Sequence, residues 1–429
     1  MKTITPVATI NCRITVPGSK SLTQRALIAA ALADGVSTLS GPLASEDTEY
    51  TSAALRAMGI AIDCSGPEWR IHGLGGRIAS PSEPIFLGNN GTATRFLTSV
   101  AALGHGPFTI SGGPRMAERP IAPLMAALRG WGVNIDSINH TGCPPLRIEA
   151  AGINGGATVL PEGKSSQYLS SLLLVAPYAR EAAELAVTGE VLSKPYVTMT
   201  LAVMEAFGLK ANANEELNRF TIPQGSYRAR DYAIEGDASS ASYFWAAAAV
   251  TGGRVTVANV PEPSLQGDAV LVAMLARMGC QVERRSSGIT VIGPGLLQAI
   301  EVDMGDCPDV APTLAVVAAF AQGTTVIKNI AHLRIKECDR LHVMATELAK
   351  LGIKTEELAD TLIIEGNPKR MGLTGATIDA HDDHRIAMCF AVAGLLVPGI
   401  TIAEESCVAK SFPDFWERFA LLGDHPDRH

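Results

Sequence analysis

The stretch Leu87-Gly88-Asn89-Asn90-Gly91-Thr92-Ala93-Thr94-Arg95 runs directly into an apolar segment, residues 96–103, which predicts a glycine turn followed by a helix. Gly88 and Gly91 have no Cβ, so the backbone can turn tightly and approach a ligand. Thr92 is the expected N-cap, which would leave free N–H groups facing the turn. Arg95, one helical turn further, adds a positive charge. The stretch predicts a cradle for an anion, although the same pattern taken alone also fits an ordinary helix cap.

Similar units recur along the whole chain. Helical patterns end in an apolar-Gly-apolar triplet at intervals of 71 to 76 residues, at Gly59, Gly132, Gly208, Gly279, Gly352 and, less cleanly, Gly423. A glycine directly after a helix is favoured because it adopts the left-handed conformation easily. An Ala-rich helical pattern and a β-branched run precede these helices, and a two-strand pattern follows most of the glycines. The regular spacing predicts six copies of helix–strand–helix–strand–strand.

The two ends of the chain are predicted to belong to one domain. The sixth copy reaches His429 with no strand pattern after Gly423, whereas residues 3–5 and 13–16 read as strands with no helix before them. We expect this N-terminal segment to complete the sixth copy. The resulting organisation is an outer domain of residues 1–18 and 235–429 and an inserted domain of residues 19–234, with three copies in each.

Composition narrows the functional class. The 429 residues are 47% hydrophobic with a mean hydropathy of +0.19, which indicates two or three domains with a large buried core. No apolar run approaches the length of a membrane span, and the N-terminus lacks an apolar signal segment. The net charge of −8 argues against a nucleic-acid surface. Eight cysteines without a Cys-x-x-Cys pair favour reduced, packed thiols, so we expect a cytoplasmic location.

Polar and charged loops precede the predicted helices. Those before the first helices of the copies are residues 17–21, 88–95, 163–167, 236–240, 306–309 and 381–385, and those before second helices are residues 118–120, 193–196 and 334–340. If the copies are arranged alike, these helix N-termini could meet at one cleft between the domains, where their dipoles add. Seven cations are expected to join them: Lys20, Arg25, Arg119, Lys336, Arg340, Arg385 and Lys410. A multiply charged, phosphorylated ligand is therefore predicted.

Several of these motifs have a second interpretation. Gly163-Lys164-Ser165 mimics the end of a P-loop, but Thr158 stands where that motif needs a glycine, so ATP binding is disfavoured. Residues 381–384 (His-Asp-Asp-His) could hold a metal, although a helix cap is favoured because no third ligand cluster lies nearby. The like charges of Lys336 and Arg340 are easier to accept if an anion lies between them.

Three further side chains near these motifs also have alternative roles. Cys338 and Cys407 are expected to pack and not to act as nucleophiles. Tyr196 fits the core or the site equally well.

At this point the motifs match a known family. They are residues 16–21 (Val-Pro-Gly-Ser-Lys-Ser), 87–93, 115–121, 165–167 (Ser-Ser-Gln), 193–196 (Ser-Lys-Pro-Tyr), 235–241, 334–340 and 383–385 (Asp-His-Arg). Their order and sequence closely resemble the 5-enolpyruvylshikimate-3-phosphate synthases, from Val16 to Asp414. The resemblance implies an α/β fold, an inside-out barrel of two three-copy domains. It also implies transfer of the enolpyruvyl group of phosphoenolpyruvate to the 5-hydroxyl of shikimate 3-phosphate, with release of phosphate, in aromatic amino-acid biosynthesis.

Site residues carry over from the resemblance position by position. Those expected to bind shikimate 3-phosphate are Lys20, Ser21, Arg25, Ser165, Ser166, Gln167, Ser193, Tyr196, Asp309, His332 and Lys336. Those expected to bind phosphoenolpyruvate are Lys20, Gly91, Arg119, Gln167, Arg340, Arg385 and Lys410. The catalytic set is Asp309, Glu337 and Lys20. His332 departs from the Asn of many relatives, and Asn90 and Phe96 depart from the Ala and Pro of some.

The chemistry suits these residue types. Glu337 would protonate the methylene carbon of phosphoenolpyruvate, Asp309 would accept the proton of the alcohol, and a tetrahedral intermediate would then expel phosphate. No metal and no organic cofactor are expected, and we expect a monomer that binds neither nucleic acid nor membrane. The two domains are expected to close on the substrates. Glyphosate is expected to occupy the phosphoenolpyruvate site beside Gly91.

Two rival functions remain. One is the sister enolpyruvyl transferase that acts on a UDP-sugar, but its members commonly carry a Cys in the loop that corresponds to residues 115–119, and this chain has none there. The other is a non-catalytic anion-binding protein. Such a protein would have no need for Asp309 and Glu337 among the cations, because their charge weakens anion binding.

Overall fold

The structure is a computed structural model that describes residues 1–162 and 165–423, and the chain divides into two compact units. The first unit is Met1–Pro17 with Glu235–His429, and the second is Gly18–Ile234. Gly18 belongs to the second unit, one residue from the boundary expected from the sequence.

The second unit contains three copies of the repeat. Its helices are α1 (Lys20–Leu32), α2 (Glu46–Ala57), α3 (Gly91–Ala102), α4 (Ala122–Gly130), α5 (Ser166–Val175) and α6 (Lys194–Ala206). Its strands are β3 (Asp34–Ser40), β4 (Ala61–Asp63), β5 (Glu68–Leu74), β6 (Ile85–Phe86), β7 (His105–Ser111), β8 (Asn134–Ser137), β9 (Leu146–Ala151), β10 (Gly156–Leu160), β11 (Ala183–Val187), β12 (Asn212–Ala213), β13 (Arg219–Ile222) and β14 (Asp231–Ala233).

The first unit holds both ends of the described chain. Its helices are α7 (Ala238–Thr251), α8 (Leu271–Arg277), α9 (Ala311–Ala318), α10 (Arg340–Lys350), α11 (His384–Gly394) and α12 (Phe415–Ala420). Its strands are β1 (Lys2–Thr3), β2 (Asn11–Ile14), β15 (Arg254–Val257), β16 (Gln281–Arg285), β17 (Gly288–Ile292), β18 (Glu301–Asp303), β19 (Thr324–Lys328), β20 (Lys354–Glu357), β21 (Leu362–Glu365), β22 (Thr377–Ile378) and β23 (Thr401–Ile402).

The repeat predicted from the glycine spacing is confirmed by the sheets. In the second copy the strand order is β6-β7-β9-β8, in which β6 and β7 are parallel and the other neighbours are antiparallel. The sheets β10-β11-β13-β12 and β18-β19-β21-β20 follow the same order. Gly59, Gly132, Gly208, Gly279 and Gly352 have φ between +83° and +108°, as expected for residues that end a helix. Gly423, the least regular of the series, instead ends a short 3-10 helix, Leu421–Gly423.

The N-terminal segment contributes one strand to each of two sheets, so the prediction that all of it completes the sixth copy is half wrong. β1 pairs antiparallel with β23 and so completes the sixth copy, as expected. β2 pairs in parallel with β15 of the fourth copy, with Cys12 opposite Val255. Its counterpart is β14, which takes the same first place beside β3 in the first copy. The sequence of a strand does not indicate which strand it pairs with, so the two sheets could not be distinguished from the sequence.

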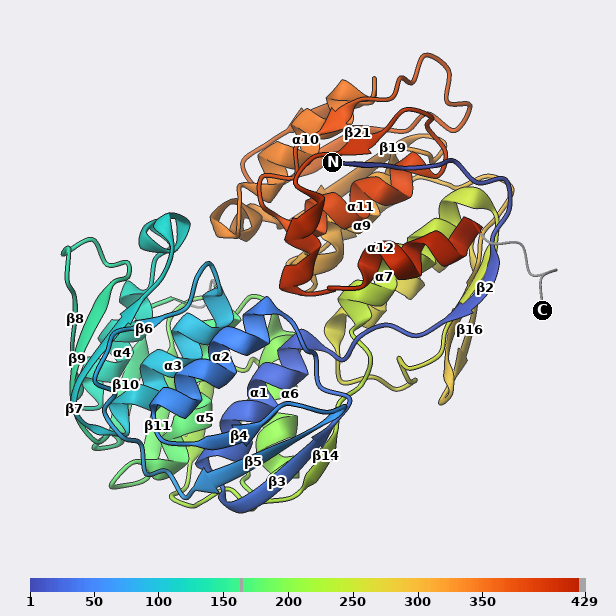
Figure 1. Ribbon diagram of the computed structural model, residues 1–429. Helices are drawn as coiled ribbons and strands as arrows, with labels where there is room; N and C mark the ends of the chain where they lie inside the picture. The colour runs from blue at the N-terminus through green and yellow to red at the C-terminus, as the bar shows by residue number, and fades with distance from the viewer. Residues whose placement is uncertain (163–164, 424–429) are drawn as a thin grey trace. The chain divides into compact units, whose positions relative to one another are not determined.

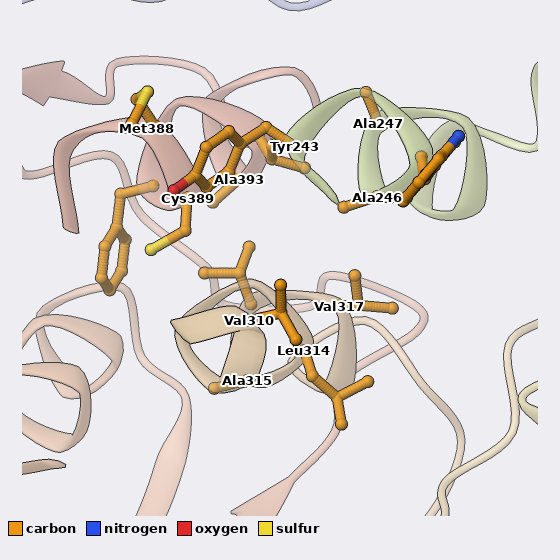
Figure 2. Close-up of a cluster of buried hydrophobic side chains, with 14 of the residues drawn as sticks. Tyr243, Ala246, Ala247, Val310, Leu314, Ala315, Val317, Met388, Cys389 and Ala393 are labelled. Atoms are coloured by element: carbon orange, nitrogen blue, oxygen red, sulfur yellow. The ribbon is translucent and has the colours of Figure 1, made fainter. Parts of the chain in front are cut away.

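The first helices of the copies form the core of each unit, and the sheets cover them (Figure 1). α7, for example, is buried almost throughout, because its run of alanines has no polar face. Figure 2 shows side chains of α7, α9 and α11, among them Tyr243, Leu314 and Cys389, gathered in the core of the first unit. Strands instead alternate, as in β5, whose buried and exposed residues follow one another. This arrangement of helices inside and sheets outside confirms the predicted α/β class.

None of the helices in the described ranges has both the length and the apolar character that crossing a bilayer requires.

Candidate functional site

The first polar cluster of the second unit lies at the start of α1. Ser19 caps this helix by accepting a hydrogen bond from the Leu22 N–H. The Lys20 ammonium lies 3.2 Å from a carboxylate oxygen of Asp47, which is buried in the first turn of α2. Asp47 belongs to none of the sequence motifs, so sequence reasoning missed it. Its contact with Lys20 in the structure is what identifies it as part of this cluster. Lys20 and Ser21 are both partly exposed at the same helix end.

Arg25 lies one turn further along α1 and is only 2% exposed. Its Nε donates to the Thr200 hydroxyl at 2.7 Å, and its Nη2 donates to the Ser170 hydroxyl at 3.1 Å. The guanidinium also lies over the rings of Phe96 and Tyr196, 5.3 and 5.9 Å from their centroids. Burial lowers the pKa of Arg25 to about 10. Its positive charge is therefore surrounded by neutral groups. Tyr196 packs against the core, which confirms the core alternative, and its role in the site stays a prediction.

The glycine turn has a different cap from the predicted one. α3 begins at Gly91, and Asn90 is the N-cap, accepting from the Ala93 N–H at 3.0 Å. The prediction for Thr92 is wrong because the helix begins two residues earlier than its pattern indicates. Gly88, with φ +54°, makes the turn. The Asn90 amide also donates to the Asp47 carbonyl at 2.6 Å, which ties the turn to the start of α2.

The arginines around this turn are held by backbone oxygens. Arg119, 4% exposed, donates to the carbonyl and side-chain oxygens of Asn89 at 3.3 and 3.2 Å. A Cβ on Gly91 would lie 2.4 Å from Nη2 of Arg119, so these two predicted phosphoenolpyruvate residues are neighbours. Arg95 donates to the carbonyls of Gly91 and Pro120 at 3.1 and 3.0 Å. Arg95, expected to add charge to the cradle, thus also braces its backbone.

The remaining predicted residues of this unit lie at the starts of α5 and α6. Ser165 is the N-cap of α5 and Ser166 is its first residue. The Gln167 amide donates to the Thr92 hydroxyl at 3.1 Å, which connects α5 to the glycine turn. Ser193 is the N-cap of α6, with φ +56°. The P-loop alternative rests on residues 163–164, which lie outside the described residues.

The first unit contains a cluster of alternating charges around Arg340, which is only 1% exposed. Its guanidinium contacts Asp383 at 2.7 Å, Glu337 at 2.8 Å and Asp309 at 3.2 Å. Arg385 contacts the second oxygen of Asp309 at 2.7 Å. Burial would lower the pKa of Arg340, but the three carboxylates raise it above its ordinary value. The predicted proton-handling pair and two of the predicted anion ligands are therefore in direct contact.

Lys336 and His332 border this cluster. Lys336 Nζ lies 4.0 Å from Asp309 and Arg340 lies 3.2 Å from it, so a carboxylate of the chain separates the two like charges in this structure. His332 is 7% exposed, and neither ring nitrogen has a hydrogen-bond partner among the described residues. Burial, together with the charge of Lys336, lowers the pKa of His332 to about 4. The imidazole is therefore neutral at physiological pH and keeps both nitrogens for hydrogen bonding.

The motif of residues 381–385 is a helix cap, as favoured from the sequence. The Asp383 side chain accepts from the Arg385 N–H at 2.9 Å at the start of α11. No group of three or more His, Cys, Asp or Glu side chains suited to a metal occurs in the described part of the chain. Lys410 is 7% exposed and lies near Asp382. The pKa of the Asp382 carboxyl is raised, because the effect of burial exceeds the opposite effect of the Lys410 charge.

Asp268, Cys338 and Cys407 of this unit have raised pKa values. Asp268, missed from the sequence, accepts a hydrogen bond from Ser239, and its pKa is raised to about 6, by burial first and by Asp309 second. Burial raises the pKa of Cys338 and Cys407, in keeping with packed thiols and not nucleophiles.

The predicted residues thus fall into two groups, one in each unit. Lys20, Ser21, Arg25, Gly91, Arg119, Ser165, Ser166, Gln167, Ser193 and Tyr196 lie at helix starts and adjoining loops of the second unit. Asp309, His332, Lys336, Glu337, Arg340, Arg385 and Lys410 lie in the first unit. Sequence reasoning missed the partners Asp47, Asp268, Ser170 and Thr200, because single polar residues inside helical patterns give no distinct signal.

Comparison with known proteins shows which family the chain resembles over nearly its whole length. The family model described as EPSP synthase (3-phosphoshikimate 1-carboxyvinyltransferase) matches residues 4–419. The chain is 44% identical to a 3-phosphoshikimate 1-carboxyvinyltransferase of Syntrophobacter fumaroxidans over 98% of its own length and 99% of that protein. A protein of the same description from Shewanella oneidensis is also 44% identical, over 97% and 98% of the two chains. An EPSP synthase structure from Acinetobacter baumannii superposes with a TM-score of 0.81 at 29% identity, covering 98% of both chains. The chain belongs to the EPSP synthase family.

Proposed function

We propose that the two groups of residues act on one pair of substrates, shikimate 3-phosphate and phosphoenolpyruvate. Members of the family transfer the enolpyruvyl group from the second to the first. The observation that carries the proposal is the contact of Asp309 and Glu337 with Arg340, because it combines groups that can exchange protons with groups that bind anions. In a protein that only binds anions, those carboxylates would compete with the ligand for Arg340 and Arg385.

The proposed division of labour follows the chemistry of each group. The second unit supplies Arg25, Ser165, Ser166, Ser193 and Tyr196 to shikimate 3-phosphate. Gly91, Arg119 and Gln167, with Arg340, Arg385 and Lys410 of the first unit, bind phosphoenolpyruvate. Lys20 serves both substrates. Holding two reactants in place can contribute on the order of 7–11 kcal/mol to lowering the barrier.

The proton transfers are assigned to the first unit. Glu337 protonates the methylene carbon of phosphoenolpyruvate, and Asp309 accepts the proton of the attacking 5-hydroxyl. The new C–O bond gives a tetrahedral intermediate with a methyl group. Glu337, now a carboxylate, takes a proton back from that methyl group as the C–O bond to phosphate breaks, which restores the C=C bond and releases phosphate. Substrate anions would replace Asp309 and Glu337 as partners of Arg340 and Arg385, which would free both carboxylates for proton transfer. His332, neutral and partly enclosed, donates a hydrogen bond to a hydroxyl of shikimate 3-phosphate.

The direct test is phosphate release. The protein should release phosphate from phosphoenolpyruvate when shikimate 3-phosphate is added, and not when UDP-N-acetylglucosamine replaces it. Phosphate release from phosphoenolpyruvate with the UDP-sugar, and not with shikimate 3-phosphate, would favour the sister transferase. Binding of phosphoenolpyruvate and shikimate 3-phosphate without any phosphate release would favour a non-catalytic role. We also propose a cytoplasmic monomer, for which light scattering after gel filtration is the check of oligomeric state.

A further inference from the structure

Arg25 uses most of its hydrogen-bonding capacity within the protein. Besides the bonds to Thr200 and Ser170, its Nη1 donates to the Ser21 carbonyl at 3.0 Å and its Nη2 to the Tyr196 carbonyl at 3.1 Å. A guanidinium has five N–H groups. Four of them therefore have acceptors within the described residues, and the fifth is on Nη1.

Two hydroxyls link this guanidinium to two other helices. Arginine can only donate, so the oxygens of Thr200 on α6 and Ser170 on α5 must both act as acceptors toward it. Thr200 and Ser170 are also 2.7 Å apart, and Thr200 lies 2.9 Å from the Tyr196 carbonyl. Both hydroxyls are completely buried. One Thr200 oxygen thus joins α1, α5 and α6.

Aromatic side chains also contact the guanidinium. Phe96 and Tyr196 lie against it at cation–π distances, and such contacts strengthen when they are shielded from water. Four hydrogen bonds and two aromatic contacts leave the group little freedom to tilt. Its orientation is therefore determined before any substrate binds.

We propose that Thr200, assisted by Ser170, is a positioning residue that orients Arg25 so that its one remaining Nη1 N–H meets a single acceptor atom of shikimate 3-phosphate. The inference rests on the proposed function, which places Arg25 at that substrate. It adds that Arg25 donates a single hydrogen bond to the substrate and does not bind it in a bidentate manner. Specificity at this point then depends on an unexposed hydroxyl in another copy of the repeat.

The test is removal of the hydroxyl without change of shape. Thr200→Val should raise the dissociation constant of shikimate 3-phosphate, measured by calorimetry, by about 10- to 150-fold, the range for a hydrogen bond to a charged group. The KM for that substrate should rise in parallel, while the KM for phosphoenolpyruvate changes by less than about threefold. Thr200→Ser keeps the hydroxyl and should restore most of the affinity.

The matched control is Thr158→Val. Thr158 is a buried threonine of the same unit whose hydroxyl donates to the Ala127 carbonyl at 2.8 Å and has no bond to Arg25. It should lower the melting temperature without shifting affinity for shikimate 3-phosphate. If Thr200→Val fails to fold, Ser170→Ala removes the second hydroxyl and should weaken binding in the same substrate-specific way.

Three outcomes would decide against the inference or against the function. Equal affinities in the two valine variants would overturn the inference, as would a loss in Thr200→Ser equal to that in Thr200→Val. A wild-type protein that binds shikimate 3-phosphate but releases no phosphate would overturn the proposed function while leaving the positioning role supported by calorimetry.

Discussion

Among the described residues, each unit has one arginine that is buried more deeply than its others, and these two have opposite surroundings. Arg340 of the first unit meets three carboxylates, which raise its pKa against the effect of burial. Arg25 of the second unit meets hydroxyls, carbonyl oxygens and aromatic rings, and burial lowers its pKa to about 10. Both side chains are 2% exposed or less.

The difference indicates two uses of the same residue. Arg340 belongs to a cluster in which Lys336, Arg340 and Arg385 face Asp309, Glu337 and Asp383, so opposite charges compensate. A compensated cluster can exchange partners and protons without a large change in net charge. Arg25 keeps an uncompensated charge in a fixed orientation, which suits recognition. The first unit is therefore suited to chemistry and the second to recognition.

The largest effect is expected from the carboxylates of the first unit. Asp309→Ala and Glu337→Ala should each lower kcat by about 100- to 10,000-fold, the range for general acid–base groups, and leave shikimate 3-phosphate binding near that of wild type. Asp309→Asn and Glu337→Gln control for lost volume and should be similarly impaired. Turnover within about threefold of wild type in the alanine variants would remove the catalytic distinction between the units.

The two arginines should also differ in their effect on stability. Arg340→Met leaves the completely buried Asp383 without its partner, and breaking such a pair costs about 3–5 kcal/mol. Arg25→Met leaves only neutral acceptors and should cost about 1–3 kcal/mol. Urea denaturation of both variants measures the contrast. Adding Asp383→Asn to Arg340→Met should recover part of the loss, and equal costs for the two single variants would show that compensation is not what separates them.

The neutral imidazole of His332 predicts a pH dependence of stability. Because its pKa is lowered to about 4 in the folded chain, the unfolded chain binds more protons between about pH 4 and 6.5. The stability contributed by His332 is thus complete above about pH 6.5 and is lost as the pH falls, by roughly 2–3 kcal/mol at pH 4.5. Denaturation of wild type at pH 7.5 and 4.5 should show this loss, and His332→Asn should lack it.

The exposed His72 supplies the control for that experiment, since His72→Asn should keep the pH dependence of wild type. If His332→Asn and wild type lose the same stability between the two pH values, the first unit's cluster does not hold a neutral imidazole.

The smallest effect concerns the glycine turn. A Cβ on Gly91 would meet the end of the Arg119 side chain, which can shift. Gly91→Ala should therefore raise the inhibition constant of glyphosate by roughly 5- to 150-fold, equivalent to about 1–3 kcal/mol, and the KM of phosphoenolpyruvate by a smaller factor. Gly113→Ala, whose Cβ would meet its nearest neighbour at 3.9 Å, is the control. Non-competitive inhibition of wild type, or equal losses for substrate and inhibitor, would contradict this placement.

Much of the fold could be predicted because its signals are local and repeated. A helix that ends at a glycine, such as α2 at Gly59, is encoded within a few residues, and five regular repetitions confirmed the period. The pairing of β2 with β15 could not be predicted, because Cys12 and Val255 are 243 positions apart and neither strand has a local feature that indicates its partner.

For the candidate site, the sequence indicated those residues whose motifs contain charged or catalytic side-chain types. Charged residues in fixed motifs, such as Asp309 and Arg340, could be singled out, and the structure places them 3.2 Å apart. Their neutral supports could not, since Thr200 resembles any threonine on a helix. The N-cap of α3 was misplaced because Asn90 and Thr92 are both good caps, and only the contact of Asn90 with Asp47 separates them.

The N-terminal strands β1 and β2 pair with strands that are synthesised much later, and this affects how the chain folds during synthesis. All three sheets of the second unit are built from residues 18–234, so this unit can fold once that segment has left the ribosome. β1 and β2 are synthesised first, yet their partners β23 and β15 emerge only after the whole second unit. At about 5–20 residues per second, β2 waits on the order of ten seconds or more for β15. The oldest residues of the nascent chain are thus among the last to fold, and during that interval their unpaired strand edges depend on chaperones or on their own short length to escape aggregation.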